Sequence, residues 1–204
     1  MENTARKVTP KEEPSYLREN WKRVLATDCQ DRYKFVRVIR NVATITNGKL
    51  MIRSPVPEKD GLYVITSTNS LTPTKTTWIN YPDVELVRPP FESMRPFCTL
   101  KNTVVHDMVN FAEQVRRVDG YIVIDHEWMC MRQKPEFHIK YPFKVSGDPI
   151  TLSPNYLKLA LIEMLRYDFV YMSREESLDK QTPLVFGHRW DTCSLVVPLT
   201  PTLV

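Results

Sequence analysis

The residues best suited to acid–base or metal chemistry in this sequence are four histidines and their acidic neighbours. The most suggestive group is Asp125-His126-Glu127, since carboxylates and an imidazole can move protons or hold a metal. The surrounding pattern predicts a strand, however, and alternate strand residues point to opposite faces. Asp125 and Glu127 would therefore face away from His126, and the group suits a strand end better than an active site.

The remaining candidates for chemistry lack partners at the required spacing. His106 has no second histidine four residues away on its predicted helix, as a helical zinc pair requires. His138 alternates with apolar strand residues, and His188 is expected in a loop between strands. The chain has only five glycines and no Gly-x-Ser-x-Gly motif, which argues against a nucleotide cradle or a serine nucleophile. We predict no catalysis, no metal and no cofactor; a small hydrolase or metal enzyme is the third-ranked alternative.

The composition is that of a globular protein outside the membrane. Hydrophobic residues make up 42% and charged residues 25% of the chain, which is sufficient for a real core. No apolar run approaches the roughly 18 residues of a membrane span, and no signal peptide is visible. The four cysteines are scattered without a Cys-x-x-Cys motif, which is typical of reduced thiols. These features predict a cytoplasmic protein.

Positive charge is concentrated in the first half of the chain. Residues 1–90 carry 15 Lys or Arg and 10 Asp or Glu, whereas residues 91–204 carry 13 and 14. A basic surface favours contact with nucleic acid, although a solvated charged face is the commoner explanation. Trp21 beside Lys22 and Arg23 could stack on a base, but it lies on an apolar helix face, so core packing is preferred.

Three amphipathic helices, each followed by short strands, form the predicted framework for these side chains. The first starts at Pro14-Ser15, and the second starts at Asn102 or Thr103, either of which can cap it. The third spans Asn155–Arg166, after an N-cap at Ser153, and Glu163 is expected off its apolar face. Asn47-Gly48 predicts a hairpin turn. Strands are expected at residues 35–39, 42–46, 49–53, 61–66, 76–79, 121–124, 127–132, 136–141, 150–152, 169–172, 183–186 and 194–199.

The helix-then-strands pattern occurs three times, starting near residues 15, 102 and 153. It predicts an α+β fold of repeated helix-plus-antiparallel-strand units. A segment with prolines near both ends, Tyr81–Pro90, separates the first unit from the second. Because proline lacks a backbone N–H and biases its predecessor to an extended shape, no helix should run through this connector.

Two segments together resemble the bacterial DNA polymerase sliding clamp. Tyr81–Pro89 is similar to the aromatic-Pro-Asp connector that precedes the last clamp domain. Residues 150–199 resemble the end of that domain, with a short strand, a Ser/Asn-Tyr-Leu helix start and a terminal Val-Val-Pro-hydrophobic sequence. Residues 99–118 are similar to its first helix, and residues 15–80 to the first half of the preceding domain.

The resemblance implies a DNA-clamp-like fold with a flexible arm at 1–13, a truncated clamp-like domain with connector at 14–90 and a complete clamp-like domain at 91–204. It also implies a DNA sliding clamp or polymerase processivity factor that encircles, or is tethered to, duplex DNA without sequence specificity. Such a protein binds DNA polymerase or another replication protein through a short peptide. A homo-oligomer is expected, since twelve helices in a ring would require four chains with three helices, or three chains with four.

Two surfaces follow from carrying the resemblance onto this sequence. For each cation a solvated helix face is an equal alternative, and for the groove residues, Val196 in particular, the alternative is burial in the core. The implied DNA-binding residues are Arg18, Lys22, Arg23, Lys101, Arg117, Lys158 and Arg166. The implied partner-peptide groove comprises Pro82, Leu86, Val87, Leu195, Val196, Val197, Pro198 and Leu199.

The sequence also departs from the clamp pattern. Ile52-Arg53-Ser54-Pro55-Val56 replaces the usual Ala-Thr-Asp-Gly-His-Arg-Leu-like segment, and Glu85-Leu86 stands where the connector usually has basic residues. A short, divergent version of this kind resembles a virus-encoded clamp, which would work in the host cytoplasm. The second hypothesis is a viral clamp-fold interaction protein that binds a replication protein without encircling DNA.

Overall fold

A computed structural model of the chain describes residues 15–27, 34–75, 81–88, 96–125, 128–131, 138–140, 149–173, 183–197 and 199. Within these ranges it contains the three expected helices, α1 (Ser15–Ala26), α2 (Asn102–Arg117) and α3 (Pro154–Met164). None of the described helices is long and apolar enough to cross a membrane. The expected arm at 1–13 and the expected strand at 76–79 lie outside the described residues.

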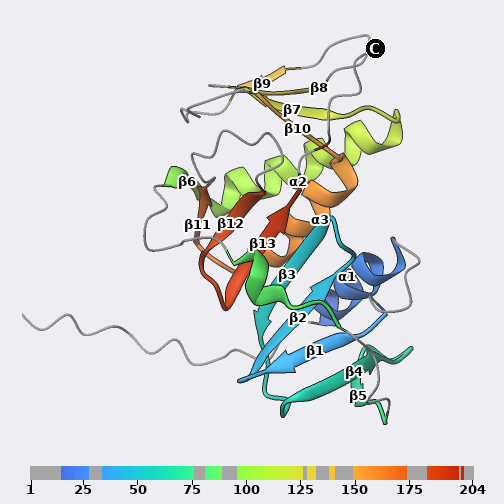
Figure 1. Ribbon diagram of the computed structural model, residues 1–204. Helices are drawn as coiled ribbons and strands as arrows, with labels where there is room; N and C mark the ends of the chain where they lie inside the picture. Colours follow the sequence, from blue (N-terminus) through green and yellow to red (C-terminus); the bar gives the residue numbers. More distant parts are fainter. Residues whose placement is uncertain are drawn as a thin grey trace, which may run out of the picture.

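The strands form two antiparallel sheets (Figure 1). The order in the four-stranded sheet is β10 (Ile150–Leu152), β7 (Ile122–Asp125), β8 (Trp128–Met131) and β9 (His138–Lys140). The order in the nine-stranded sheet is β5 (Leu71–Pro73), β4 (Gly61–Ile65), β1 (Val36–Ile39), β2 (Val42–Thr46), β3 (Leu50–Pro55), β13 (Thr192–Val196), β12 (Leu184–Arg189), β11 (Phe169–Ser173) and β6 (Pro96–Lys101).

The larger sheet joins an N-terminal unit (residues 15–73) to a C-terminal unit (residues 96–196). The joint is the β3–β13 pair, in which Arg53 lies opposite Cys193 and Leu50 opposite Val196. On either side the order is the same, with β2, β1 and β4 following β3, and β12, β11 and β6 following β13. Strand β4 thus occupies the position in the N-terminal unit that β6 occupies in the C-terminal unit.

The three helices lie side by side on one face of the large sheet, with α3 between α1 and α2 (Figure 1). The predicted apolar faces are buried there: Trp21 and Leu17 on α1, Met108 and Phe111 on α2, and Leu157 on α3 each have at most 3% of their surface exposed. Core packing of Trp21 is therefore confirmed. The buried face of α2 also includes Val105, Ala112 and Val115, whereas Val118, just beyond the helix end, is 49% exposed.

A second, smaller core covers the opposite face of the sheet at the joint between the units. Connector residues Tyr81 and Val84 pack there with Met51 of β3 and Leu195 of β13. The connector contains one 3₁₀ turn, η2 (Val84–Val87), which the prolines at its ends did not indicate. One turn fits between the prolines because a 3₁₀ turn needs only a few residues.

The predicted N-cap position is found at α3 but not at α2. Ser153 is the N-cap of α3 and Pro154 occupies its first turn, as expected, but the Ser153 side chain makes no capping hydrogen bond. Lys101 is the N-cap of α2, so neither predicted capping residue holds that position. Asn102 instead donates its side-chain amide to the carbonyls of Leu165 and Tyr167, at 2.7 and 2.9 Å. That amide ties the start of α2 to the chain just beyond α3.

Candidate functional site

A pocket of about 180 Å³ lies between the connector and the end of β13. Its walls are mainly apolar, with the charged residues Lys49 and Asp83 also contributing. The lining residues are Thr46, Gly48, Lys49, Leu50, Met51, Pro82, Asp83, Val84, Pro183, Leu195 and Val197. Four segments of the chain therefore build it: the β2–β3 hairpin, the connector, Pro183 just before β12, and the end of β13.

The hairpin wall is fixed by its Asn-Gly turn, at the position predicted from the sequence. Gly48 has φ = 89°, a left-handed conformation that glycine adopts without steric cost. The Asn47 carboxamide oxygen accepts hydrogen bonds from the backbone N–H groups of Lys49 and Leu50, at 3.0 and 2.8 Å. Beyond the turn, the N–H of Val197 donates to the Lys49 carbonyl at 2.9 Å. This wall is thus continuous with the sheet.

The connector wall is attached at its start by hydrogen bonds to the sheet. Tyr81 donates its hydroxyl to the Thr44 carbonyl at 3.0 Å, and Arg37 Nη1 donates to the Pro82 carbonyl at 3.4 Å. The Asp83 carboxylate then caps the 3₁₀ turn by accepting from the Glu85 N–H at 3.1 Å. Asp83 therefore has two roles, since it also lines the pocket.

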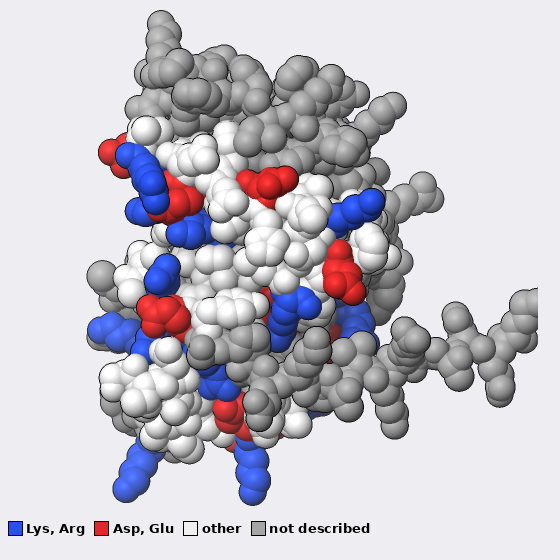
Figure 2. Space-filling view, turned by 180° about the vertical axis from the view of Figure 1, so that it is seen from behind, with Lys and Arg blue, Asp and Glu red and all other residues white. Residues whose placement is uncertain are grey.

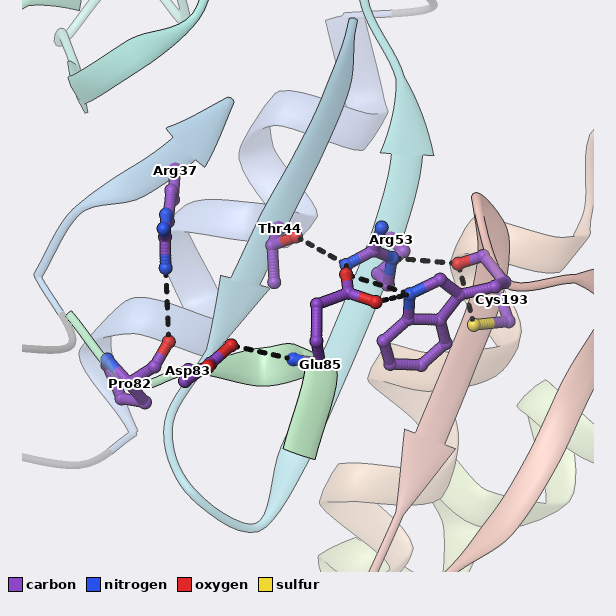
Figure 3. Close-up of polar contacts among 8 residues, drawn as sticks. Arg37, Thr44, Arg53, Pro82, Asp83, Glu85 and Cys193 are labelled. Carbon is purple, nitrogen blue, oxygen red and sulfur yellow. Dashed lines mark hydrogen bonds and ion pairs between the residues drawn. The ribbon is translucent and has the colours of Figure 1, made fainter. Parts of the chain in front are cut away.

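Farther along the connector, the Glu85 side chain joins a polar cluster with Arg53 of β3 and Trp190 of the β12–β13 turn (Figure 3). Both carboxylate oxygens of Glu85 accept from the Trp190 indole N–H at 3.0 Å, and Oε1 lies 3.4 Å from Arg53 Nη1. Arg53 also donates through Nε to the Trp190 carbonyl at 2.8 Å and stacks 4.1 Å from the indole centroid. Burial lowers the pKa of the Arg53 guanidinium, an effect that Cys193 and Glu85 oppose.

Some of the predicted groove residues line the pocket, some lie elsewhere, and some lie outside the described part of the chain. Pro82, Leu195 and Val197 line the pocket. Val196 is fully buried in the main core, and Leu86 points outward with 84% of its surface exposed. Leu199 is not among the lining residues, and its N–H donates to the Thr151 carbonyl of β10 at 2.8 Å. The side chain of Val87 and the whole of Pro198 lie outside the described part.

Most of the predicted DNA-binding cations are paired with carboxylates. The described pairs, with their N–O distances, are Arg18–Glu58 at 2.9 Å, Arg23–Glu19 at 3.6 Å, Arg117–Glu113 at 3.1 Å, Lys158–Glu113 at 2.8 Å and Arg166–Glu163 at 2.9 Å. Lys22 donates to the Ser67 carbonyl at 3.1 Å. Lys101, at the start of α2, has no carboxylate partner among the described residues.

Glu113 is the centre of one charge cluster. Its carboxylate accepts two hydrogen bonds from the Arg116 guanidinium, at 2.8 and 2.9 Å, and also lies next to Arg117 and Lys158. The hydrogen bonds from Arg116 and Lys158 hold the pKa of the Glu113 carboxyl well below its usual range. One carboxylate therefore serves three cations on neighbouring helices.

Glu163 was expected off the apolar face of α3, and that expectation was wrong. Its side chain is fully buried, accepts from the Trp21 indole N–H at 3.0 Å and lies 2.9 Å from Arg166 Nη2. Arg166 in turn donates to the Ser54 hydroxyl at 2.9 Å. The reason is tertiary, because α1 covers this side of α3 and supplies an indole donor. Buried carboxylates are found where such partners are available.

The whole helix side carries a small net charge. Helices α1, α2 and α3 contain six Lys or Arg and four Asp or Glu, an excess of two positive charges. Among the described residues, the view from behind Figure 1 shows basic and acidic groups interspersed, without a continuous basic surface (Figure 2). Any attraction to an anion on this side is therefore moderate.

The described histidines lie on separate elements. Asp125 ends β7, as expected, and residues 126–127 lie outside the described ranges. His106 is exposed on α2, and His138 is in a strand. His188 lies in β12, so the prediction of a loop was wrong there. Among the described residues, no three His, Cys, Asp or Glu side chains are grouped so that they could hold a metal ion.

The sequence did not predict the hairpin residues of the lining, Asp83, Val84 or Pro183, nor the neighbouring cluster of Arg53, Glu85 and Trp190. Two residues of the cluster had given a signal: Arg53 lies in the segment that departs from the clamp pattern, and Glu85 occupies a usually basic connector position. Nothing in the sequence indicated that the two departures would meet in space.

No protein-family model matches the chain, and no curated protein matches it in sequence. Solved structures do match. The beta chain of DNA polymerase III from Streptococcus pneumoniae superimposes with a TM-score of 0.57 at 12% identity, covering 98% of this chain and 69% of that one. The Helicobacter pylori beta clamp bound to a DNA ligase peptide gives 0.59 at 10% identity, covering 94% and 67%.

The Borrelia burgdorferi DNA polymerase III subunit beta gives a TM-score of 0.55 at 12% identity, covering 91% of this chain and 61% of its own length. The chain thus spans about two thirds of the length of the clamp subunits it matches. At such low identity the match concerns the fold, and the α+β class and the clamp-like architecture expected from the sequence are confirmed. The chain has the fold of the bacterial DNA polymerase sliding clamps.

Proposed function

We propose that this protein is a DNA sliding clamp or processivity factor that holds a replication protein on duplex DNA without sequence preference. The observation that carries the proposal is the clamp fold across nearly the whole chain, with a mainly apolar pocket between the connector and the last strand. The protein would do no chemistry, because a clamp acts by keeping its partner close to DNA.

Contact with DNA would use the helix side of the large sheet. Lysine and arginine side chains attract phosphates at long range and without reading bases, so the bound protein can slide. The small excess of positive charge on the helices suits a weak, mobile contact. Among the implied DNA-binding residues, Lys101 and Lys22 are those without a carboxylate partner in the described part of the chain.

Contact with a partner protein would use the pocket. A volume of about 180 Å³ is sufficient for one or two large apolar side chains, and a peptide lying beside an exposed chain segment can add backbone hydrogen bonds. The Helicobacter pylori neighbour, which was solved with a DNA ligase peptide, supports this class of ligand. We therefore propose a short peptide of DNA polymerase or another replication protein as the occupant.

The assembly would be a homo-oligomer. One chain covers about two thirds of a clamp subunit. A ring of twelve helices would contain four chains in total if each contributes three helices, or three chains if each contains a fourth helical unit. The truncated and complete clamp-like domains at 14–90 and 91–204, an origin in a virus and a location in the host cytoplasm are parts of the same proposal.

The decisive experiment is retention on DNA of two topologies. Protein loaded on nicked circular plasmid is separated by gel filtration, before and after the plasmid is cut once with a restriction enzyme. A closed ring should stay on the circle and leave the linear form, because only free ends let it slide off. Light scattering of the same preparation gives the number of copies. A monomer that never stays on circular DNA would contradict the encircling function.

A second candidate is a clamp-fold interaction protein that binds a replication protein without encircling DNA. The extensive pairing of the helix-side cations with carboxylates favours this candidate, since paired charges attract phosphates less strongly. It predicts peptide binding in the pocket together with no retention on circular DNA. The topological experiment and a peptide-binding assay together separate the two functions.

A further inference from the structure

The two walls of the pocket differ in how they are attached. The hairpin and the β13 end belong to the sheet, where a ladder of backbone hydrogen bonds holds them. The opposite wall, Pro82-Asp83-Val84, belongs to a connector with a 3₁₀ turn. Among the described residues, the backbone bonds of this turn are short-range: Leu86 N–H to the Asp83 carbonyl and Arg88 N–H to the Glu85 carbonyl. The position of this wall must therefore come from side chains.

Glu85 makes the polar side-chain contacts on the far side of that wall. Its carboxylate reaches Trp190, which is 8% exposed, and Arg53, whose side chain is 10% exposed (Figure 3). Arg53 is flanked by Thr44 on β2 and Cys193 on β13, so it sits at the centre of the joint between the units. It is also two residues from Met51, which lines the pocket.

We propose that Glu85 is a positioning residue of the pocket. It fastens the connector turn to Arg53 and Trp190, and so holds the Pro82-Asp83-Val84 wall at the distance from the hairpin that an apolar peptide side chain requires. Glu85 itself is not among the lining residues. The inference rests on the proposed peptide-binding function and assigns to Glu85 the regulation of affinity at that site.

The physical basis is preorganisation. A wall that is already in place loses little conformational entropy when the peptide binds. A loosened wall must become ordered on binding, and this entropy loss weakens the affinity. Removal of the Glu85 side chain leaves Arg53 with the Trp190 carbonyl and the indole ring, so the sheet keeps its internal contacts. The expected defect is therefore confined to the connector.

The probe is a peptide selected on the wild-type full-length chain from a random decapeptide phage library. Its place of binding is checked with Val197→Asp, which puts a charge into the pocket wall. Affinity is then measured by fluorescence anisotropy for Glu85→Ala, Glu85→Gln and the matched control Glu58→Gln. Glu58 is another carboxylate paired with an arginine, at 2.9 Å, and it is not a pocket residue.

We expect Kd to rise about tenfold for Glu85→Ala and about threefold for Glu85→Gln, whose amide oxygen can still accept from Trp190. Glu58→Gln should stay within about twofold of wild type. In the peptide-free protein, hydrogen exchange at residues 84–88 should become faster in Glu85→Ala, while β3 and β13 exchange as before. Trp190→Phe replaces the indole with a phenyl ring and removes the N–H, and the double variant should bind the peptide about as weakly as Glu85→Ala alone.

Unchanged Kd and unchanged exchange in Glu85→Ala would overturn the positioning role. Weaker binding with unchanged exchange would also overturn it, because Glu85 would then touch the peptide directly. If no selected peptide loses affinity in Val197→Asp, the peptide-binding function itself fails and this inference fails with it. The exchange experiment needs no peptide, so the two failures can be told apart.

Discussion

Two polar clusters tie the N-terminal unit to the C-terminal unit, one on each face of the same sheet. On the helix side, Glu163 of α3 connects to Trp21 of α1 and to Arg166, and its side chain has no exposed surface. On the connector side, Glu85 connects to Arg53 and Trp190, and its side chain is 56% exposed. Each cluster contains one glutamate, one arginine and one tryptophan.

Because the two glutamates differ in exposure, we expect the two clusters to have different effects on stability, although their composition is the same. A carboxylate out of contact with water is costly, and breaking a buried pair leaves an uncompensated charge. The helix-side cluster should therefore contribute to global stability. A half-exposed carboxylate can be rehydrated when its partners are lost, so the connector-side cluster should influence local order more than folding. Four substitutions test this division, from the largest expected effect to the smallest.

Glu163→Ala should lower the free energy of unfolding by about 3–5 kcal/mol, because it leaves Arg166 and the Trp21 N–H buried without the carboxylate. The measurement is urea denaturation followed by tryptophan fluorescence. Trp21→Phe is the comparison: it removes the indole donor and part of the buried ring but keeps the Glu163–Arg166 pair, so it should cost less. A loss below about 1 kcal/mol would show that the buried cluster does not hold the units together.

Glu85→Ala should lower the free energy of unfolding by about 1 kcal/mol, a value reduced for its exposure to solvent. The same denaturation experiment measures it beside Glu163→Ala. If the two substitutions cost the same, burial does not distinguish the clusters and the division proposed above is wrong.

Glu113→Gln tests a carboxylate between these extremes, with a side chain that is 22% exposed and three cationic neighbours. The pKa of Glu113 is lower in the folded chain than in the unfolded one, so its ionised form stabilises the fold at pH values above the ordinary glutamate pKa of about 4.3. The stability gap between wild type and Glu113→Gln should be constant above about pH 5.5 and narrow as the pH falls. Thermal unfolding at several pH values measures this gap, and a gap that widens in acid would contradict the assignment.

Leu86→Ser should change the free energy of unfolding by less than about 0.5 kcal/mol, because Leu86 is 84% exposed and lies outside the pocket lining. Peptide affinity should also be nearly unchanged. The anisotropy assay described for Glu85 measures it. A large loss of affinity would place Leu86 on the rim of the peptide site, as the sequence resemblance implies, and would widen the role of the connector.

Much of the fold was predictable because its signals are local. Periodic apolar residues located all three helices to within about two residues, and Asn47-Gly48 located the β2–β3 hairpin. Strands β5 and β6 were missed, since each lies at an edge of the large sheet, where one neighbouring strand is enough and the apolar pattern is short. The 3₁₀ turn was missed because prolines mark where a helix stops without showing that a single turn can fit between them.

The candidate pocket was only partly predictable. The resemblance brought the connector and the last strand together, and the structure places Pro82, Leu195 and Val197 in one lining. Whether a neighbouring residue lines the pocket depends on the direction of its side chain. Val196 points to the opposite face and lies in the core, and Leu86 points outward from the 3₁₀ turn. Neighbouring strand residues point to opposite faces of the sheet, so a motif alone cannot tell which of them line the pocket and which enter the core.

The sequence by itself determined the repeated helix-plus-strand pattern, the lack of a visible catalytic constellation and the connector, because these depend on residue type and spacing along the chain. Only the tertiary structure decided that Glu163 is buried, that Glu85 meets Arg53 and Trp190, and that five of the proposed DNA-binding cations are paired with carboxylates. These contacts join residues up to 142 positions apart. Their formation depends on how α1, α3 and the connector pack against the shared sheet, and no local pattern encodes that packing.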